Sequence, residues 1–482
     1  MPRYNYERLS AQDNMFLMME RPNVPMHVAA TMIFEAGPLA TSEGGIDIDR
    51  YKRAIESVLH RIPRYRQKLR WIPMSDRPVW VDDRHFNLDY HIRHRALPKP
   101  GNLRQLKDLA AHIMSQQLDR SKPQWEIYVV EGLEGDRFAV ISKIHHCMVD
   151  GSSGTDLATI LMSPSPDQEI SEPAPYYPRP APSGTELVRD ELMHTATMPL
   201  QATRSLREFT SRVEDVRDEL GKRARALGEL VRWGAISASE TPINGRLSPH
   251  RRCDWLTTPL HQVKDIRRAF DCTVNDVVLA VVTGAFREYL IHRRVDPSEI
   301  DFRISAPVSV RSAKEKGKLG NRVSSWIVRL PLGEEDPKAQ LDAIRAATQD
   351  LKNSEQALGV DMIMKAAEYA PASLMSLGAQ ASSGPINSIV TNVPGPQFPL
   401  YTLGAKLLSM YPQVPLLDNV GIGVALFSYD GDLCWGFNAD FEMVPDLDAF
   451  RREIERSLER LSTAAGVVRD SKASKAKPKS NG

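Results

Sequence analysis

The 482-residue sequence has few cysteines, no long hydrophobic run and almost no net charge. Its four cysteines, Cys147, Cys253, Cys272 and Cys434, are widely separated, so neither a disulfide framework nor a CxxC-type zinc site is supported. No apolar run approaches the ~18 residues that a membrane-spanning helix needs. A net charge of +1 excludes a global field suited to nucleic acid or to an anionic membrane surface.

The composition is that of an ordinary soluble globular protein, and at this length we expect two or three domains. The first residues lack the apolar core of a secretory signal. Few cysteines and no disulfide framework favour a reducing compartment. We therefore expect a cytoplasmic protein.

Proline and glycine divide the chain into regions. Repeated prolines between 163 and 184 predict an extended linker, at which we place a domain boundary. Strands interleaved with helices on both sides of it predict a two-layer α/β sandwich in each half. The predicted regions are an N-terminal domain 1–184, a helical connector 185–245, a C-terminal domain 246–466 and a disordered tail 467–482.

One stretch, HHCMVDG at 145–151, carries the residue types of a reactive site. The run 138–144 before it is apolar and β-branched and predicts a buried strand. Because successive side chains of a strand point to opposite faces, His145 and His146 do not aim at one point unless a bulge intervenes. The pattern therefore disfavours a His–His metal pair. It also turns Cys147 away from His146 and predicts a buried structural thiol rather than a nucleophile.

This stretch matches the HHxxxDG signature, and the chain resembles the bacterial wax ester synthase/diacylglycerol acyltransferases of the chloramphenicol acetyltransferase-like superfamily. Further stretches similar to that family lie at 9–16, 25–28, 273–279, 307–311 followed by 319–324, and 391–396. The resemblance spans roughly residues 5–465. It implies an α/β fold of two chloramphenicol acetyltransferase-like sandwich domains, with the active site in a channel between them.

The resemblance also implies an activity. We expect a CoA-dependent O-acyltransferase that moves a long-chain acyl group from acyl-CoA to diacylglycerol, to a fatty alcohol or to both, by direct transfer without an acyl-enzyme. Acyl-CoA is then a co-substrate, and neither a cofactor nor a metal is expected. Such substrates imply peripheral association with the inner face of the membrane or with lipid bodies, for which an apolar helix at 362–377 is a candidate contact. Burial of this helix in the core is the alternative.

Two alternatives stay open. The first is a condensing acyltransferase that takes acyl groups from carrier proteins. The second is a lipid-binding homologue that has lost activity.

The resemblance assigns roles within the motif. The family's general base is the second histidine, which maps onto His146, and imidazole titrates close to working pH. His145 is expected to face away from it and to act in support. Asp150 is expected to point away and pair with an arginine, for which Arg311 is the candidate, although its residue type also allows a second base. Gly151 is expected to supply a backbone conformation that a Cβ would penalise.

A second group of candidates, Asn275 and Asp276, lies in the first turn of a predicted helix that begins after Thr273. Amide and acidic residues suit this position simply as helix caps. The resemblance instead places the pair at the active site, facing the histidine across the domain interface. There Asn275 would donate a hydrogen bond to the developing oxyanion.

Overall fold

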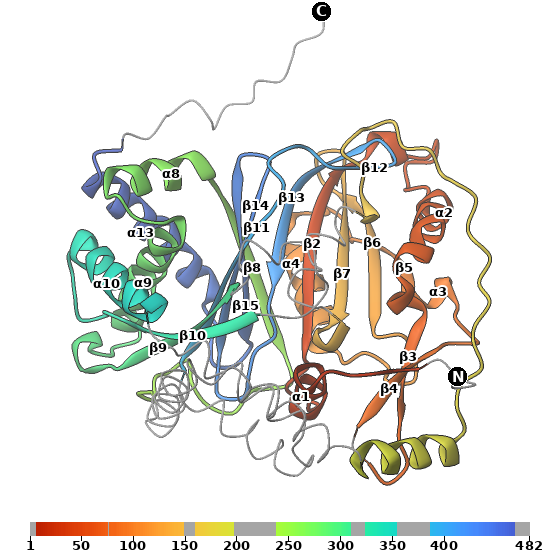
Figure 1. Cartoon of the computed structure of the whole chain (residues 1–482). Helices are drawn as coiled ribbons and strands as arrows, with labels where there is room; N and C mark the ends of the chain where they lie inside the picture. The colour runs from red at the N-terminus through yellow and green to blue at the C-terminus, as the bar shows by residue number, and fades with distance from the viewer. Residues whose placement is uncertain are drawn as a thin grey trace, which may run out of the picture.

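Two α/β halves stand side by side in the computed structural model, each built on a six-stranded sheet with helices packed against it (Figure 1). The structure describes residues 6–75, 77–148, 160–196, 238–309, 323–353 and 386–467. The α/β fold with two sandwich domains, predicted from the sequence, is confirmed.

The sheet of the first half has the order β12-β13-β2-β7-β6-β5, and only the β5–β6 pair is parallel. Its strands are β12 (Tyr401–Thr402), β13 (Ala405–Gln413), β2 (His27–Glu35), β7 (Arg137–His145), β6 (Trp125–Leu133) and β5 (Ile92–Ala96). The strand predicted at 138–144 is β7. A tight turn with positive φ at Gly135 and Asp136 joins it to β6, as a hairpin requires.

Strand β13 comes from the C-terminal part of the chain but pairs with β2 of the N-terminal sheet. Met410 lies opposite Met32 in this antiparallel pair. In Figure 1 the blue strand stands beside the red one. The two halves therefore share a sheet, a feature that the regions 1–184 and 246–466 did not include.

The second half has the sheet order β10-β9-β11-β14-β15-β8, in which β11 runs parallel to both its neighbours. Its strands are β10 (Val323–Leu330), β9 (Phe302–Ser309), β11 (Ser388–Pro394), β14 (Ile422–Tyr429), β15 (Asp432–Asp440) and β8 (Arg251–Pro259). Its helices are α8 (Leu260–Ala269), α9 (Val274–His292), α10 (Pro337–Asn353) and α13 (Leu447–Ala464).

Helix α9 is the centre of this second core. Its Phe286 ring lies 4.8 Å from the rings of both Phe302 and Phe450, between the sheet and α13. Nearly all its residues from Asp276 to Leu290 are buried, as expected for a helix that is apolar on most sides. Among the described residues, no single helix is long and apolar enough to cross a membrane, and α8 and α9 pass that test only as a pair bent by 100°.

Helix α4 packs against strands of both halves. The first half contains α1 (Ala11–Met19), α2 (Ile48–Val58), α3 (Leu88–His91), α4 (Leu103–Ser115), the 3-10 turn η4 (His146–Met148) and a small sheet of β1 (Glu7–Arg8), β4 (Pro78–Asp82) and β3 (Gln67–Trp71). One buried apolar cluster joins Leu106 of α4, Ile141 of β7 and Trp255 of β8. Strand β7 is thus packed into a core that both halves share.

The proline-rich stretch is extended, as predicted, and lies along the first half. The hydroxyl of Tyr176 donates to the carbonyl of Arg66 at 3.0 Å. Arg179 pairs with Asp82 of β4 at 2.9 Å. A helix over 184–196 follows.

Candidate active site

The histidine motif begins where β7 ends, against the start of β2. His145, the last residue of β7, lies opposite His27. The backbone N–H of His145 donates to the carbonyl of Gln124 at 3.0 Å, and that of His146 donates to the carbonyl of Met26 at 2.8 Å. The backbone at both histidines is therefore fixed by the strands beside it, and η4 then turns the chain away.

The two histidine rings have different surroundings. His145 is fully buried. His146 is partly exposed, and its ring stacks on Phe16 of α1, with ring centroids 3.8 Å apart and planes inclined by 22°. The pair does not converge on one point.

His146 has the protonation state that a general base needs. Although the residue is partly exposed, its ring is largely removed from water, and this desolvation lowers its pKa from 6.5 to about 4. The ring is therefore neutral at neutral pH. Its buried Nδ1 has no hydrogen-bond partner among the described residues. A neutral imidazole held by stacking can accept a proton from a hydroxyl group.

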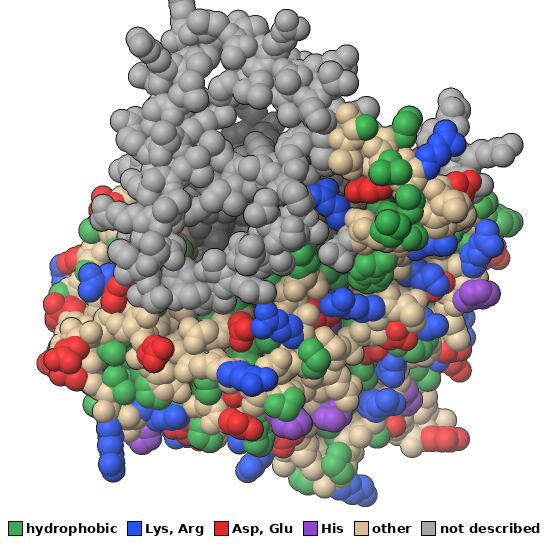
Figure 2. Space-filling model, turned by 90° about the horizontal axis from the view of Figure 1, so that it is seen from below, with side chains coloured by type: hydrophobic (Ala, Val, Ile, Leu, Met, Phe, Trp, Pro, Cys, Tyr) green, Lys and Arg blue, Asp and Glu red, His purple; other side chains and the backbone are tan. Residues whose placement is uncertain are grey.

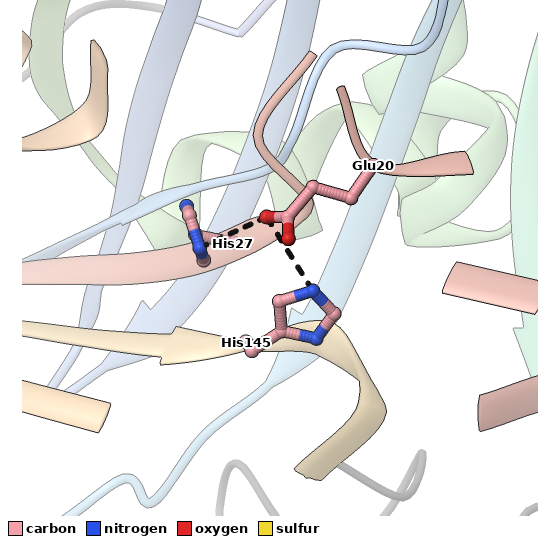
Figure 3. Close-up of side chains that lie close together, drawn as sticks. All are labelled: Glu20, His27 and His145. Atoms are coloured by element: carbon pink, nitrogen blue, oxygen red, sulfur yellow. Dashed lines mark ion pairs between the residues drawn. The ribbon is translucent and has the colours of Figure 1, made fainter. Parts of the chain in front are cut away.

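His145 belongs to a buried cluster with Glu20 and His27 (Figure 3). Oε1 of Glu20 lies 3.3 Å from Nε2 of His27 and 3.5 Å from Nε2 of His145. Arg120 binds the other carboxylate oxygen through two nitrogens, at 3.1 and 2.8 Å. Burial opposes ionisation of Glu20, but its contacts with His145 and Arg120 outweigh this effect and lower its pKa.

Cys147 is a buried structural thiol, as the sequence predicts. It packs with Leu17, Leu69 and Trp80. Burial raises the pKa of its thiol well above the ordinary value. The thiol therefore stays protonated and lacks the thiolate character that a nucleophile needs.

Asp276 caps its own helix. Its carboxylate accepts hydrogen bonds from the N–H and hydroxyl of Thr273 and from the hydroxyl of Thr348, at 2.9, 2.7 and 2.8 Å. This capping box accounts for its burial. Asn275, one residue earlier, is partly buried, and its side chain has no hydrogen-bond partner in the described part of the chain. A role for either residue in catalysis stays a prediction.

Several predicted residues lie outside the described ranges. They are Asp150, Gly151, Arg311, the helix at 362–377 and most of the connector and the tail. The Asp150–Arg311 pair therefore stays a prediction.

Four residues near the histidines were not singled out from the sequence: Phe16, Glu20, His27 and Arg120. Phe16 and His27 belong to the stretches 9–16 and 25–28 that resemble the family, but nothing in their local pattern indicates a partner. The one signal in the sequence was His27, a histidine at the start of the apolar strand β2.

Family models match most of the chain. Residues 9–278 match the wax ester synthase/diacylglycerol acyltransferase catalytic domain, and residues 319–462 match the C-terminal domain of the same family. The chain is 32% identical over 469 residues to a putative diacylglycerol O-acyltransferase of Mycobacterium tuberculosis, covering 94% of this chain and 90% of that protein.

Solved structures also match this chain over nearly its whole length. A wax ester synthase/diacylglycerol acyltransferase from Marinobacter aquaeolei superimposes with a TM-score of 0.64 at 26% identity, covering 95% of this chain and all of that one. The starter condensation domain of rhizomide synthetase shares the fold at 13% identity and a TM-score of 0.57, covering 96% of this chain and 94% of that one. With its histidine motif at the end of β7 and both family domains matched, the chain belongs to the wax ester synthase/diacylglycerol acyltransferase family.

Proposed function

We propose that this chain transfers a long-chain acyl group from acyl-CoA to the hydroxyl group of diacylglycerol, of a fatty alcohol or of both. The observation that carries the proposal is His146, a neutral imidazole stacked on Phe16 at the end of β7, in a chain of this family. Acyl-CoA is a co-substrate, and the proposed reaction draws on side chains alone.

The proposed mechanism uses His146 twice. Its unprotonated ring nitrogen accepts the hydroxyl proton of the acceptor while the hydroxyl oxygen attacks the thioester carbonyl. The tetrahedral intermediate then collapses, the carbon–sulfur bond breaks, and the imidazolium returns the proton to the CoA thiolate. Asn275, at the positive end of α9, is the proposed donor to the oxyanion. The protonated thiol of Cys147 supports direct transfer without an acyl-enzyme.

Thiol release tests this proposal. Purified full-length protein is expected to release CoA from palmitoyl-CoA only when dioleoylglycerol or hexadecanol is added, and the ratio of the two rates gives the acceptor preference. Release that requires an acyl-carrier protein would instead indicate a condensing enzyme. Binding of acyl-CoA without turnover of either acceptor would indicate a lipid-binding homologue.

We also propose that the protein is cytoplasmic and meets a membrane or lipid body peripherally, because both acceptors partition into lipid. Apolar side chains at one edge of the first half support this. Pro73, Val188 and Leu192 line one surface hollow, and beside it Met74 is fully exposed. The helix over 184–196 lies at the bottom right in Figure 1, and Figure 2 shows hydrophobic side chains gathered on the right of the face seen from below.

Liposome flotation tests this contact. The double variant Met74→Glu/Leu192→Glu is expected to float less than wild type, because two charges would have to enter the lipid interface. Ile291→Glu, a change at an exposed apolar residue of α9 in the other half, is the matched control and is expected to float like wild type. Equal flotation of all three proteins would place the lipid contact elsewhere.

A further inference from the structure

We propose that Glu20, with Arg120, is a positioning assembly that holds His145 and, through it, the turn that presents His146. This inference rests on the proposed function for its catalytic consequence. Its structural content is independent of that function.

The turn fixes the tautomer of His145. The backbone N–H of Cys147 donates to Nδ1 of His145 at 3.1 Å, so this nitrogen carries no proton. The ring proton is then on Nε2, which is buried, makes no hydrogen bond among the described residues and faces Oε1 of Glu20 across 3.5 Å. Because Cys147 directly follows His146, this ring lies between the peptide after His146 and the Glu20 carboxylate. Any rotation of the His145 ring would move that peptide.

Glu20 is held from several sides. Its side chain is 1% exposed, and a buried carboxylate is stable only when its oxygens are paired. The backbone N–H of Met26 donates to Oε1 at 3.3 Å, on the side of His27. Arg120 binds Oε2 and also donates to the carbonyl of Leu17 at 3.1 Å, which ties the last turn of α1 to the same guanidinium.

Helix α1 and Glu20, the residue that caps its C-terminal end, reach both histidines. Phe16 stacks on His146, and Glu20, four residues later, points at His145. Residues four apart share a helix face, and the N–H of Glu20 donates to the carbonyl of Phe16 at 3.2 Å. The helix therefore sets the positions of the two rings together, although the motif itself lies more than a hundred residues further along the chain.

The same three residues have the chemistry of a metal site. Ligand atoms of Glu20, His27 and His145 all lie within 4.8 Å of one another. However, Arg120 already neutralises Glu20, and Lys143 lies beside the cluster, where its charge disfavours a cation at His27. A divalent ion would add two further positive charges to a buried group that is already compensated, so the local charges disfavour a metal ion here.

Steady-state kinetics of full-length variants test the positioning role. Glu20→Gln keeps the shape but removes the charge, and Arg120 remains partly exposed, so the chain is expected to fold. We expect kcat to fall about 10- to 100-fold with KM for acyl-CoA within about twofold, because the turn is misplaced while substrate binding is kept. The matched control is Asp82→Asn, a buried carboxylate in the same half that pairs with Arg179 and Gln67. It is expected to lower the melting temperature and leave kcat and KM unchanged.

A second pair of variants does not depend on Glu20. In His145→Asn the amide oxygen can still accept the Cys147 N–H, whereas His145→Ala loses this bond. His145→Asn is therefore expected to retain the higher kcat of the two. Equal kcat in these two variants, or a wild-type kcat in folded Glu20→Gln, would overturn the positioning role.

Two measurements are independent of activity and so separate this inference from the proposed function. In full-length protein with isotopically labelled histidine, NMR is expected to show His145 with its proton on Nε2, with the signal assigned from His145→Asn and perturbed in Glu20→Gln. A proton on Nδ1 would overturn the assembly. The second measurement is the metal content of the purified protein. A stoichiometric metal in wild type that is lost in Glu20→Gln would show that these residues form a metal site instead of a positioning assembly.

Discussion

Replacing His146 by alanine is expected to lower kcat by ~10²–10⁴-fold, because the variant loses the group that accepts and returns the proton. The backbone bond to Met26 is kept, so the protein is expected to fold. Thiol release under saturating substrates, with circular dichroism to confirm folding, measures the effect.

The matched control is His85→Ala, at an exposed histidine of the same half, which is expected to keep the wild-type kcat. Cys147→Ser is expected to act through folding rather than chemistry, since it places a hydroxyl among apolar side chains. A folded His146→Ala protein with a rate close to wild type would remove His146 from the mechanism.

The same residue sets the expected pH dependence. With burial lowering its pKa from 6.5 to about 4, His146 stays unprotonated and active as pH falls below neutrality, and kcat/KM should decline only near the lower value. Its folded-state pKa lies below the unfolded one. Its contribution to stability is therefore present above pH 6.5 and is lost as pH falls towards about 4.

Replacing Gly436 by alanine is expected to destabilise the fold by ~3 kcal/mol or more, the upper range for overpacking. A Cβ there would lie 1.7 Å from the carbonyl oxygen of Pro412. Gly436 is on β15 and Pro412 is on β13, the strand that joins the N-terminal sheet. The backbones meet where the two halves are joined, so neither can move without disturbing a sheet.

Urea unfolding of Gly436→Ala against Gly37→Ala measures this cost. An added Cβ at Gly37 meets nothing within 4 Å, so that variant is expected to unfold like wild type. Equal stability of both variants would mean that β13 does not pack against β15 in this way.

Features with a local signal were predicted from the sequence. The apolar run at 138–144 gave β7, and Thr273 followed by Asp276 begins α9 with a capping box. These elements depend on side-chain alternation and on hydrogen bonds between residues a few positions apart, both of which are visible in the sequence.

Features that depend on distant pairing were not predicted. Strand β13 contains Lys406 and Pro412 and has no clear alternation, and its place beside β2 is fixed by packing against the second sheet. Likewise, Glu20, Arg120 and His145 meet only because α1, the loop after α4 and the end of β7 converge. A lone buried carboxylate in the sequence gives no indication of which cation it pairs with.

The central claim is most directly tested by following an isotopically labelled acyl group. Purified protein, labelled palmitoyl-CoA and diacylglycerol are mixed, and lipids and intact protein are analysed by mass spectrometry. We expect labelled triacylglycerol in amounts equal to the CoA released, with no labelled protein, and almost no triacylglycerol or free CoA from His146→Ala. Label on the protein, or CoA release without labelled triacylglycerol, would contradict direct transfer by this chain.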